Sequence, residues 1–190
     1  MSVRCPTFPG MTAHAVLPVL LRGYDDAWER LDRRLAGLGD EEYRWEPVSG
    51  AWTARRVGDM WEVDRTRPDP DPAPVTTIAW RTWHLGSDCL AGYLDRSPAG
   101  RPVAVAGTQW HGTAEPALRD LGTAVTAFRA AMTDLGEEGM WSLLGPSWGP
   151  YAESRWADLF VHALDELVHH AAEIALLRDL YGWRGQTASR

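Results

Sequence analysis

The chain has 190 residues and a net charge of −7, from 26 acidic and 19 basic residues. A chain of this length buries enough apolar surface to fold without a disulfide or structural metal. Apolar residues make up 45% and charged residues 24%, which is the composition of a globular protein and excludes a disordered or fibrous one. The acidic balance argues against a nucleic-acid partner, because neutralising phosphates supplies most non-specific affinity.

Other classes are excluded by what the sequence lacks. No apolar run approaches the ~20 residues of a membrane helix, and the N-terminus lacks the apolar run of a secretory signal. Cys5 and Cys89 are too few for a disulfide framework, so we expect a cytoplasmic protein with no membrane partner. Every basic residue is Arg, which excludes Schiff-base chemistry and a lysine general base.

The first half of the chain predicts two helices joined by a long connection. Apolar residues three and four apart predict a first helix over about residues 12–38, stopped by Gly37 and Gly39. Residues 39–75 are expected to be irregular, with RPDPDPAP (67–74) kept extended by its alternating prolines. A second helix is predicted over about 76–95, with Thr76 or Thr77 as its N-cap.

The second half predicts two more helices. Residues 101–113 read as a loop with a short extended segment at 103–105, and a third helix follows from Thr113 to near Gly136. A connection rich in Gly, Pro and Trp leads to the last helix, about 153–181. We therefore predict an all-α, antiparallel-type four-helix bundle with two long crossover connections, forming one domain over 1–190 with loose termini at 1–11 and 184–190.

The last helix carries three pairs of imidazole and carboxylate side chains four residues apart, which places each pair on one face of a helix. These pairs are His162/Glu166, Asp165/His169 and Glu166/His170. Apolar residues flank them on both sides, so several ionisable groups are expected to be at least partly buried and to need partners or a metal. Periodicity alone leaves open whether Glu166/His170 or Asp165/His169 faces the interior.

A metal site in a bundle needs a ligand from another helix, and His84 in the second helix is the candidate. Two nitrogens and one oxygen with an open fourth position are typical of a catalytic zinc or related divalent centre. The open position would take water or an anionic substrate atom with a lowered pKa. The alternative for His84 is an ordinary packed histidine.

Three segments together resemble the DinB-like superfamily of bacterial four-helix-bundle metalloproteins. They are TTIAWRTWHLGSD (76–88), HALDELVHHAAEIALLRDLY (162–181) and LGDEEYRWEPVSGAW (38–52). The superfamily's usual ligands are a His in the second helix and a His-x-x-x-His pair in the last, so the resemblance implies His84 and His170 as ligands. Glu166 stands where most of the superfamily has His.

That departure is similar to a related branch, the mycothiol-dependent maleylpyruvate isomerases, which use a Glu-x-x-x-His pair. The resemblance therefore favours Glu166/His170 over Asp165/His169. It implies a divalent metal, with zinc the first candidate and nickel the second, that binds the thiolate of a low-molecular-weight thiol. The implied activity is S-transfer to a small electrophilic substrate by a homodimer.

Two other functions remain open: a metal-dependent hydrolase, and a non-catalytic metal- or ligand-binding bundle with a stress-response role. Around the metal, His162 is expected to hydrogen-bond Glu166 and Asp88 to orient the ring of His84. His169 is the third residue expected to support the metal ligands. The alternative for Asp88 is that its carboxylate is simply exposed to solvent. Neither Cys5 nor Cys89 is expected to act as a nucleophile.

Overall fold

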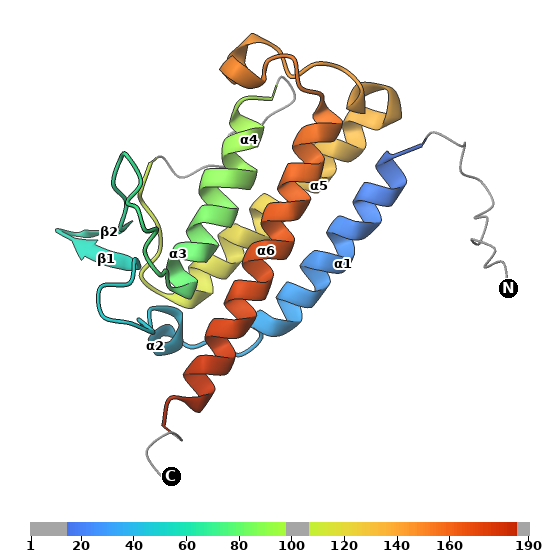
Figure 1. Cartoon of the computed structure of the whole chain (residues 1–190). Helices are drawn as coiled ribbons and strands as arrows, with labels where there is room; N and C mark the ends of the chain where they lie inside the picture. Colours follow the sequence, from blue (N-terminus) through green and yellow to red (C-terminus); the bar gives the residue numbers. More distant parts are fainter. Residues whose placement is uncertain (1–14, 98–106, 186–190) are drawn as a thin grey trace, which may run out of the picture.

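The structure is a computed structural model that describes residues 15–97 and 107–185. Its elements in chain order are α1 (Leu17–Leu35), α2 (Asp40–Tyr43), β1 (Ala54–Val57), β2 (Met60–Val63), α3 (Ile78–Trp83), the π-helix η1 (His84–Ala91), α4 (Gly92–Asp95), α5 (Ala114–Met140), the 3-10 helix η2 (Pro146–Tyr151) and α6 (Trp156–Trp183). The successive segments α3, η1 and α4 form one helical rod, which we call the second bundle helix (Figure 1). The predicted four-helix bundle is therefore confirmed.

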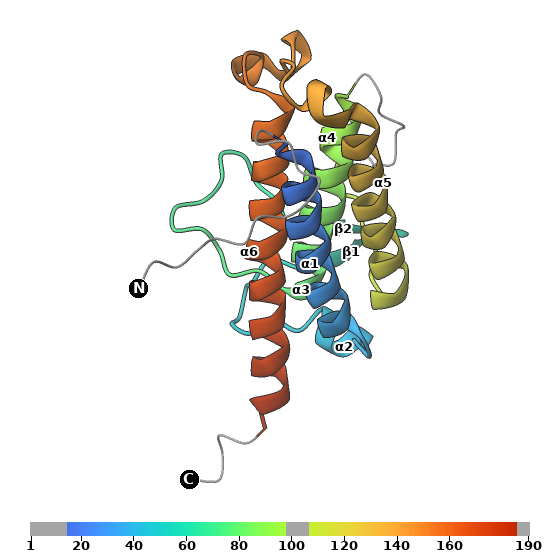
Figure 2. The ribbon, with the colours of Figure 1, turned by 90° about the vertical axis from the view of Figure 1, so that its right-hand side faces the viewer.

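The four long helices pack as two pairs that each run in parallel (Figures 1 and 2). Along α1 and α6, Gly23 lies beside Leu164 and Arg34 reaches the carbonyl of Ala175, so the numbering rises together. Tyr93 likewise packs on Phe128 of α5, with ring centroids 6.3 Å apart.

The expected antiparallel type of packing is therefore wrong for these nearest pairs. α1 ends and α3 begins at the same end of the bundle, whereas α4 ends at the opposite end from the one where α5 begins (Figure 1). Antiparallel contacts occur between the pairs instead. One example is the ion pair between Asp25 of α1 and Arg129 of α5, 2.5 Å apart.

The local signals at several helix ends behave as the sequence predicts. The Thr77 hydroxyl accepts a hydrogen bond from the Trp80 amide at 3.3 Å and so caps α3. Gly136, at φ 70°, interrupts the helical backbone of α5 close to its predicted end. The expected extended segment at 103–105 and the expected loose terminus 1–11 lie outside the described residues.

Residues 39–75 are not wholly irregular, which corrects the sequence prediction. They contain α2 and an antiparallel hairpin in which Ala54 pairs with Val63 and Val57 with Met60. Each strand has four residues, so neither gives a recognisable alternating pattern. Gly58, at φ 60°, supplies the left-handed backbone of the tight turn between them.

The core between the helices is aromatic and aliphatic. Its almost completely buried aromatic residues include Tyr24, Trp83, Phe128 and Phe160. The Tyr24 hydroxyl donates to the carbonyl of Val125, which satisfies its one polar group. None of the helices in the described ranges is long and apolar enough to cross a membrane.

The start of α1 is held by a side chain from the far end of α5. The Glu137 carboxylate accepts hydrogen bonds from the amides of Val16 and Leu17, both at 2.9 Å. These amides hold the pKa of Glu137 below its usual value. A carboxylate at this position satisfies free amides and complements the positive end of the helix dipole.

We predict that Glu137→Gln lowers the free energy of unfolding by about 1 kcal/mol at neutral pH. Because the folded-state pKa of Glu137 is lowered, the wild-type advantage is present above the ordinary carboxyl pKa and is lost as pH falls through the folded value. Urea unfolding at neutral and acidic pH measures both effects. The exposed neighbour Glu138 gives the control, Glu138→Gln, and equal losses in the two variants would contradict the capping role.

Candidate metal centre

The face of α6 that points into the bundle is defined by a stripe of buried residues. The stripe has three- and four-residue spacing and consists of Trp156, Phe160, Ala163, Leu167, His170, Ile174 and Leu177. His170 is only 4% exposed, and Glu166 lies one turn before it. Asp165 and His169 are both exposed. Burial therefore places the pair Glu166/His170, and not Asp165/His169, toward the interior.

His84 comes to this pair from the second bundle helix. It is the first residue of η1, and its ring stacks on Trp80 with centroids 5.0 Å apart and an interplanar angle of 17°. Its side chain is 22% exposed, against 19% for Glu166 and 5% for His170, so solvent reaches the centre at His84 and Glu166 but not at His170.

Glu166 is the meeting point of the two imidazoles. Its Oε2 lies 2.9 Å from Nε2 of His170 and 3.4 Å from Nε2 of His84. The two imidazole rings are 4.9 Å apart and nearly perpendicular. The structure thus brings together the three side chains that the sequence indicated as ligands, and it directs the same ring nitrogen of each histidine at one carboxylate oxygen.

The second nitrogen of each ring is held by another carboxylate. Nδ1 of His84 lies 3.2 Å from Asp88, and Nδ1 of His170 lies 2.7 Å from Glu173. When Nδ1 donates to such a carboxylate, Nε2 keeps its lone pair, which is the tautomer that a metal ligand requires. Arg65 in turn pairs with Asp88 at 2.8 Å.

Two arginines close this network on its outer side. Besides Arg65, which pairs with Asp88, Arg81 pairs with Glu173 at 3.0 Å, and burial lowers the pKa of the Arg81 guanidinium.

Burial alone would lower the pKa of His84, but hydrogen bonds to Asp88, Cys89 and Glu166 outweigh the effect of burial and raise the pKa to about 11. Hydrogen bonds from His170 and His84 lower the pKa of Glu166. Without a metal, the centre is therefore a buried ion-pair network.

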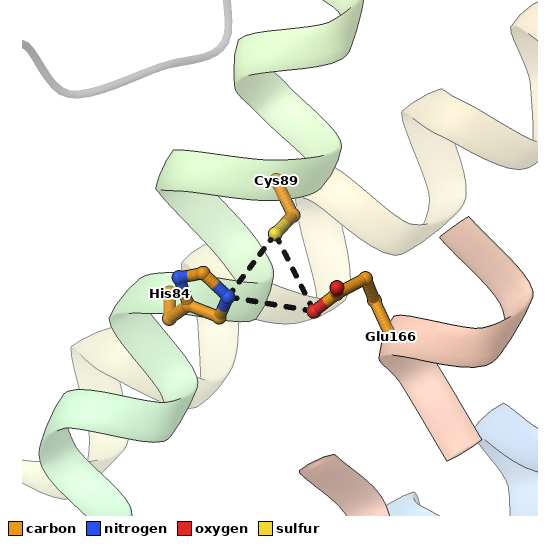
Figure 3. A group of neighbouring side chains, drawn as sticks. All are labelled: His84, Cys89 and Glu166. Atoms are coloured by element: carbon orange, nitrogen blue, oxygen red, sulfur yellow. Dashed lines mark hydrogen bonds and ion pairs between the residues drawn. The ribbon is translucent and has the colours of Figure 1, made fainter. Parts of the chain in front are cut away.

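Cys89 belongs to the centre as well, although sequence reasoning left it aside. Its sulfur lies 3.5 Å from Nε2 of His84 and 3.9 Å from Oε2 of Glu166 (Figure 3). The donor atoms of His84, Cys89 and Glu166 all lie within 4.8 Å of one another. In an α-helix, residues five apart point about 140° away from each other, so α-helical periodicity hides this contact.

The π-helix η1 (His84–Ala91) removes that separation, because its turn spans one more residue than an α-helical turn. His84 and Cys89 then lie on the same side of the helix. Within the sequence, only the combination of a histidine and a cysteine five apart could have signalled the contact, and it becomes meaningful only once the π-helix is known.

The other expected supporting residues have different positions. Asp88 does contact the ring of His84, as described above. His162 is exposed, and its Nε2 lies 3.8 Å from the second oxygen of Glu166. His169 is exposed, contacts Glu173 at 3.3 Å and stacks on the ring of His170 with centroids 4.9 Å apart. Sequence reasoning missed the supporting roles of Glu173 and Arg81, which lie three residues from His170 and His84, and of Arg65, which is distant from the centre along the chain.

Two cavities flank the centre. One of about 210 Å³ lies against His84 and is walled by Trp52, Trp80, Arg65 and Arg81. The other, of about 370 Å³, is lined by Tyr93, Trp148 and His162, and His162 also contacts Glu166. The larger cavity falls in the size range of small-molecule sites, about 300–1,000 Å³, and the one beside His84 is smaller.

Comparison with known proteins places this architecture in a family. The chain is similar to a solved structure described as the conserved protein of locus from Enterococcus faecalis, with a TM-score of 0.59 and 16% sequence identity over 88% of this chain and 98% of that chain. That likeness concerns the fold. No curated protein matches the chain. A family model of the DinB superfamily matches residues 24–174, which include every described residue of the centre, and the chain therefore belongs to the DinB superfamily.

Proposed function

We propose that the protein holds a divalent metal ion with His84, Glu166 and His170 and is a thiol S-transferase that acts on a small electrophile. The observation that carries the metal centre is the convergence of two imidazole Nε2 atoms on one oxygen of Glu166, at 2.9 and 3.4 Å. Membership of a superfamily that commonly binds metals supports it.

The donor chemistry of the centre fits such an ion. Two imidazoles and a carboxylate suit zinc first and nickel second. The carboxylates of Asp88 and Glu173 orient the two rings, and Arg65 and Arg81 neutralise those carboxylates without taking a donor atom from the centre. Every buried charge of the network therefore keeps a partner when Glu166 turns toward a cation instead of the imidazoles.

A bound divalent ion would supply positive charge that lowers the pKa of a small thiol and so raises the population of its nucleophilic thiolate. The chain's own residues then position the reactants. Trp52 and Trp80 offer flat apolar walls beside His84, in a cavity of about 210 Å³. A cavity of this volume favours a small electrophile over a polymeric one.

The transferase is favoured over the two alternatives by the resemblance of the Glu166/His170 pair to the Glu-x-x-x-His pair of the mycothiol-dependent isomerases. A hydrolase would use the same metal ligands but would activate water instead of a thiol.

A cytoplasmic location agrees with the transferase proposal, because small thiols stay reduced there. Exposed apolar side chains along the outer face of α6, among them Leu176 and Trp183, are compatible with a homodimer.

We predict that His170→Ala weakens zinc binding by more than about 100-fold, beyond the effect of losing a residue that only supports a ligand. The matched control is His169→Ala, the neighbouring exposed position, whose removal is expected to change the affinity far less. Titration calorimetry of metal-free protein measures both. If His169→Ala abolished binding and His170→Ala did not, the ligand pair would be Asp165/His169 instead.

Thiol dependence tests the proposed reaction. Wild-type protein and the His84→Ala variant are each loaded with zinc or with nickel. Each sample is then incubated with a chromogenic aryl halide, with and without a small thiol. We expect consumption of the halide that requires the thiol and is lost in His84→Ala. Failure of the wild type to consume the electrophile with either metal would contradict the transferase, and thiol-independent cleavage of an ester would instead indicate a hydrolase.

Asp88 tests whether ring orientation matters. We predict that Asp88→Asn, which leaves all three proposed ligands in place, weakens zinc binding about 10- to 100-fold because Nδ1 of His84 loses its charged acceptor. Asp95→Asn on the exposed face of α4 is the control. An unchanged affinity in Asp88→Asn would show that Asp88 only pairs with Arg65.

A further inference from the structure

Cys89 is the one thiol in the described part of the chain, and it is only 4% exposed. Its sulfur does not point into an apolar pocket, which is the usual surrounding of a packed cysteine. It faces Nε2 of His84 and Oε2 of Glu166, two of the atoms that form the proposed metal centre (Figure 3). A thiol in this position needs an explanation beyond packing.

The separations among the three donor atoms match those of a tetrahedral centre. With zinc–sulfur bonds of about 2.3 Å and zinc–nitrogen or zinc–oxygen bonds of about 2.0–2.2 Å, adjacent donors of a tetrahedron lie about 3.6 Å apart for sulfur with nitrogen or oxygen, and about 3.4 Å apart for nitrogen with oxygen. The observed separations are 3.5 Å for Cys89 with His84, 3.9 Å for Cys89 with Glu166, and 3.4 Å for His84 with Glu166. Little movement would be needed to place one ion among them.

The local backbone supports this arrangement. η1 brings Cys89 to the side of the helix that carries His84, whereas an α-helix would turn its sulfur away. A π-helical segment is rare, and such segments occur frequently at functional sites. Here its effect is to add a sulfur to a set of nitrogen and oxygen donors.

We propose that Cys89 binds the metal as a thiolate, so that the resting centre has four protein donors: His84, Cys89, Glu166 and His170. Binding forms a sulfur–metal bond and breaks the S–H bond, and the proton leaves to water. This inference rests on the proposed metal centre and adds to it a soft donor, which favours zinc over metals that prefer oxygen. It also means that a substrate thiol must compete with the protein's own sulfur.

Cobalt(II) reports directly on a sulfur ligand, because a cobalt–thiolate bond gives intense charge-transfer absorption in the near ultraviolet. Tetrahedral coordination by itself gives visible bands, whether or not sulfur is a ligand. The full-length protein, Cys89→Ser and Cys5→Ser are each titrated with cobalt(II). We expect the near-ultraviolet band in wild type and in Cys5→Ser. In Cys89→Ser we expect that band to be lost and the visible bands to remain, with zinc affinity lower by more than about 100-fold, as expected for loss of a direct ligand rather than of a supporting residue.

A thiol titration keeps the test independent of how well Cys89→Ser folds. In Cys5→Ser protein, where Cys89 is the remaining thiol, zinc is expected to slow modification by a disulfide reagent at least tenfold, and a chelator is expected to restore the rate. Visible cobalt bands in wild type without the near-ultraviolet band, or modification unaffected by zinc, would overturn the Cys89 proposal and leave the three-ligand centre standing. If wild type binds no cobalt at all, both proposals fail.

Discussion

The constraint on which the centre depends is the cost of keeping charged groups away from water. The side chains of Glu166 and His170 extend from α6 into its interface with the second bundle helix, where an unpaired charge would cost several kcal/mol. His84 and His170 compensate Glu166, and Asp88 and Glu173 hold the outer nitrogens of the two rings. Because each group has a partner in a fixed direction, the network also fixes the positions of the atoms that would bind a metal.

The packing of the bundle aligns these groups in order. The second bundle helix and α6 run in opposite directions, so rising numbers on one meet falling numbers on the other. Arg81 contacts Glu173, His84 contacts His170, and Cys89 contacts Glu166. One antiparallel helix pair thus supplies every proposed donor, while α1 and α5 cover it from behind and exclude water from the apolar core.

Much of the fold followed from local signals in the sequence. Apolar spacing located the four helices, and Thr77 and Gly136 marked ends that the structure confirms. The three side chains His84, Glu166 and His170 were identified from their residue types, the four-residue spacing of the last two and a family resemblance. Their identity as metal ligands stays a prediction.

What the sequence could not indicate depends on contacts that local patterns do not carry. The hairpin at 54–63 is too short to show alternation, and the parallel pairing of helices depends on contacts between residues far apart in the sequence, such as Gly23 with Leu164. The π-helix arises where the second bundle helix packs against its neighbours, with Gly86 close to Leu121, and no residue pattern specifies it. Cys89 was missed for that reason, since α-helical geometry turns it away from His84.

An anomalous difference map from crystals of metal-loaded protein, measured at the absorption edge of zinc, tests the central claim most directly. The account predicts one strong peak between the second bundle helix and α6, within about 2.0–2.2 Å of Nε2 of His84, Nε2 of His170 and an oxygen of Glu166. A peak at Asp165 and His169, or loaded crystals with no peak between these helices, would contradict it.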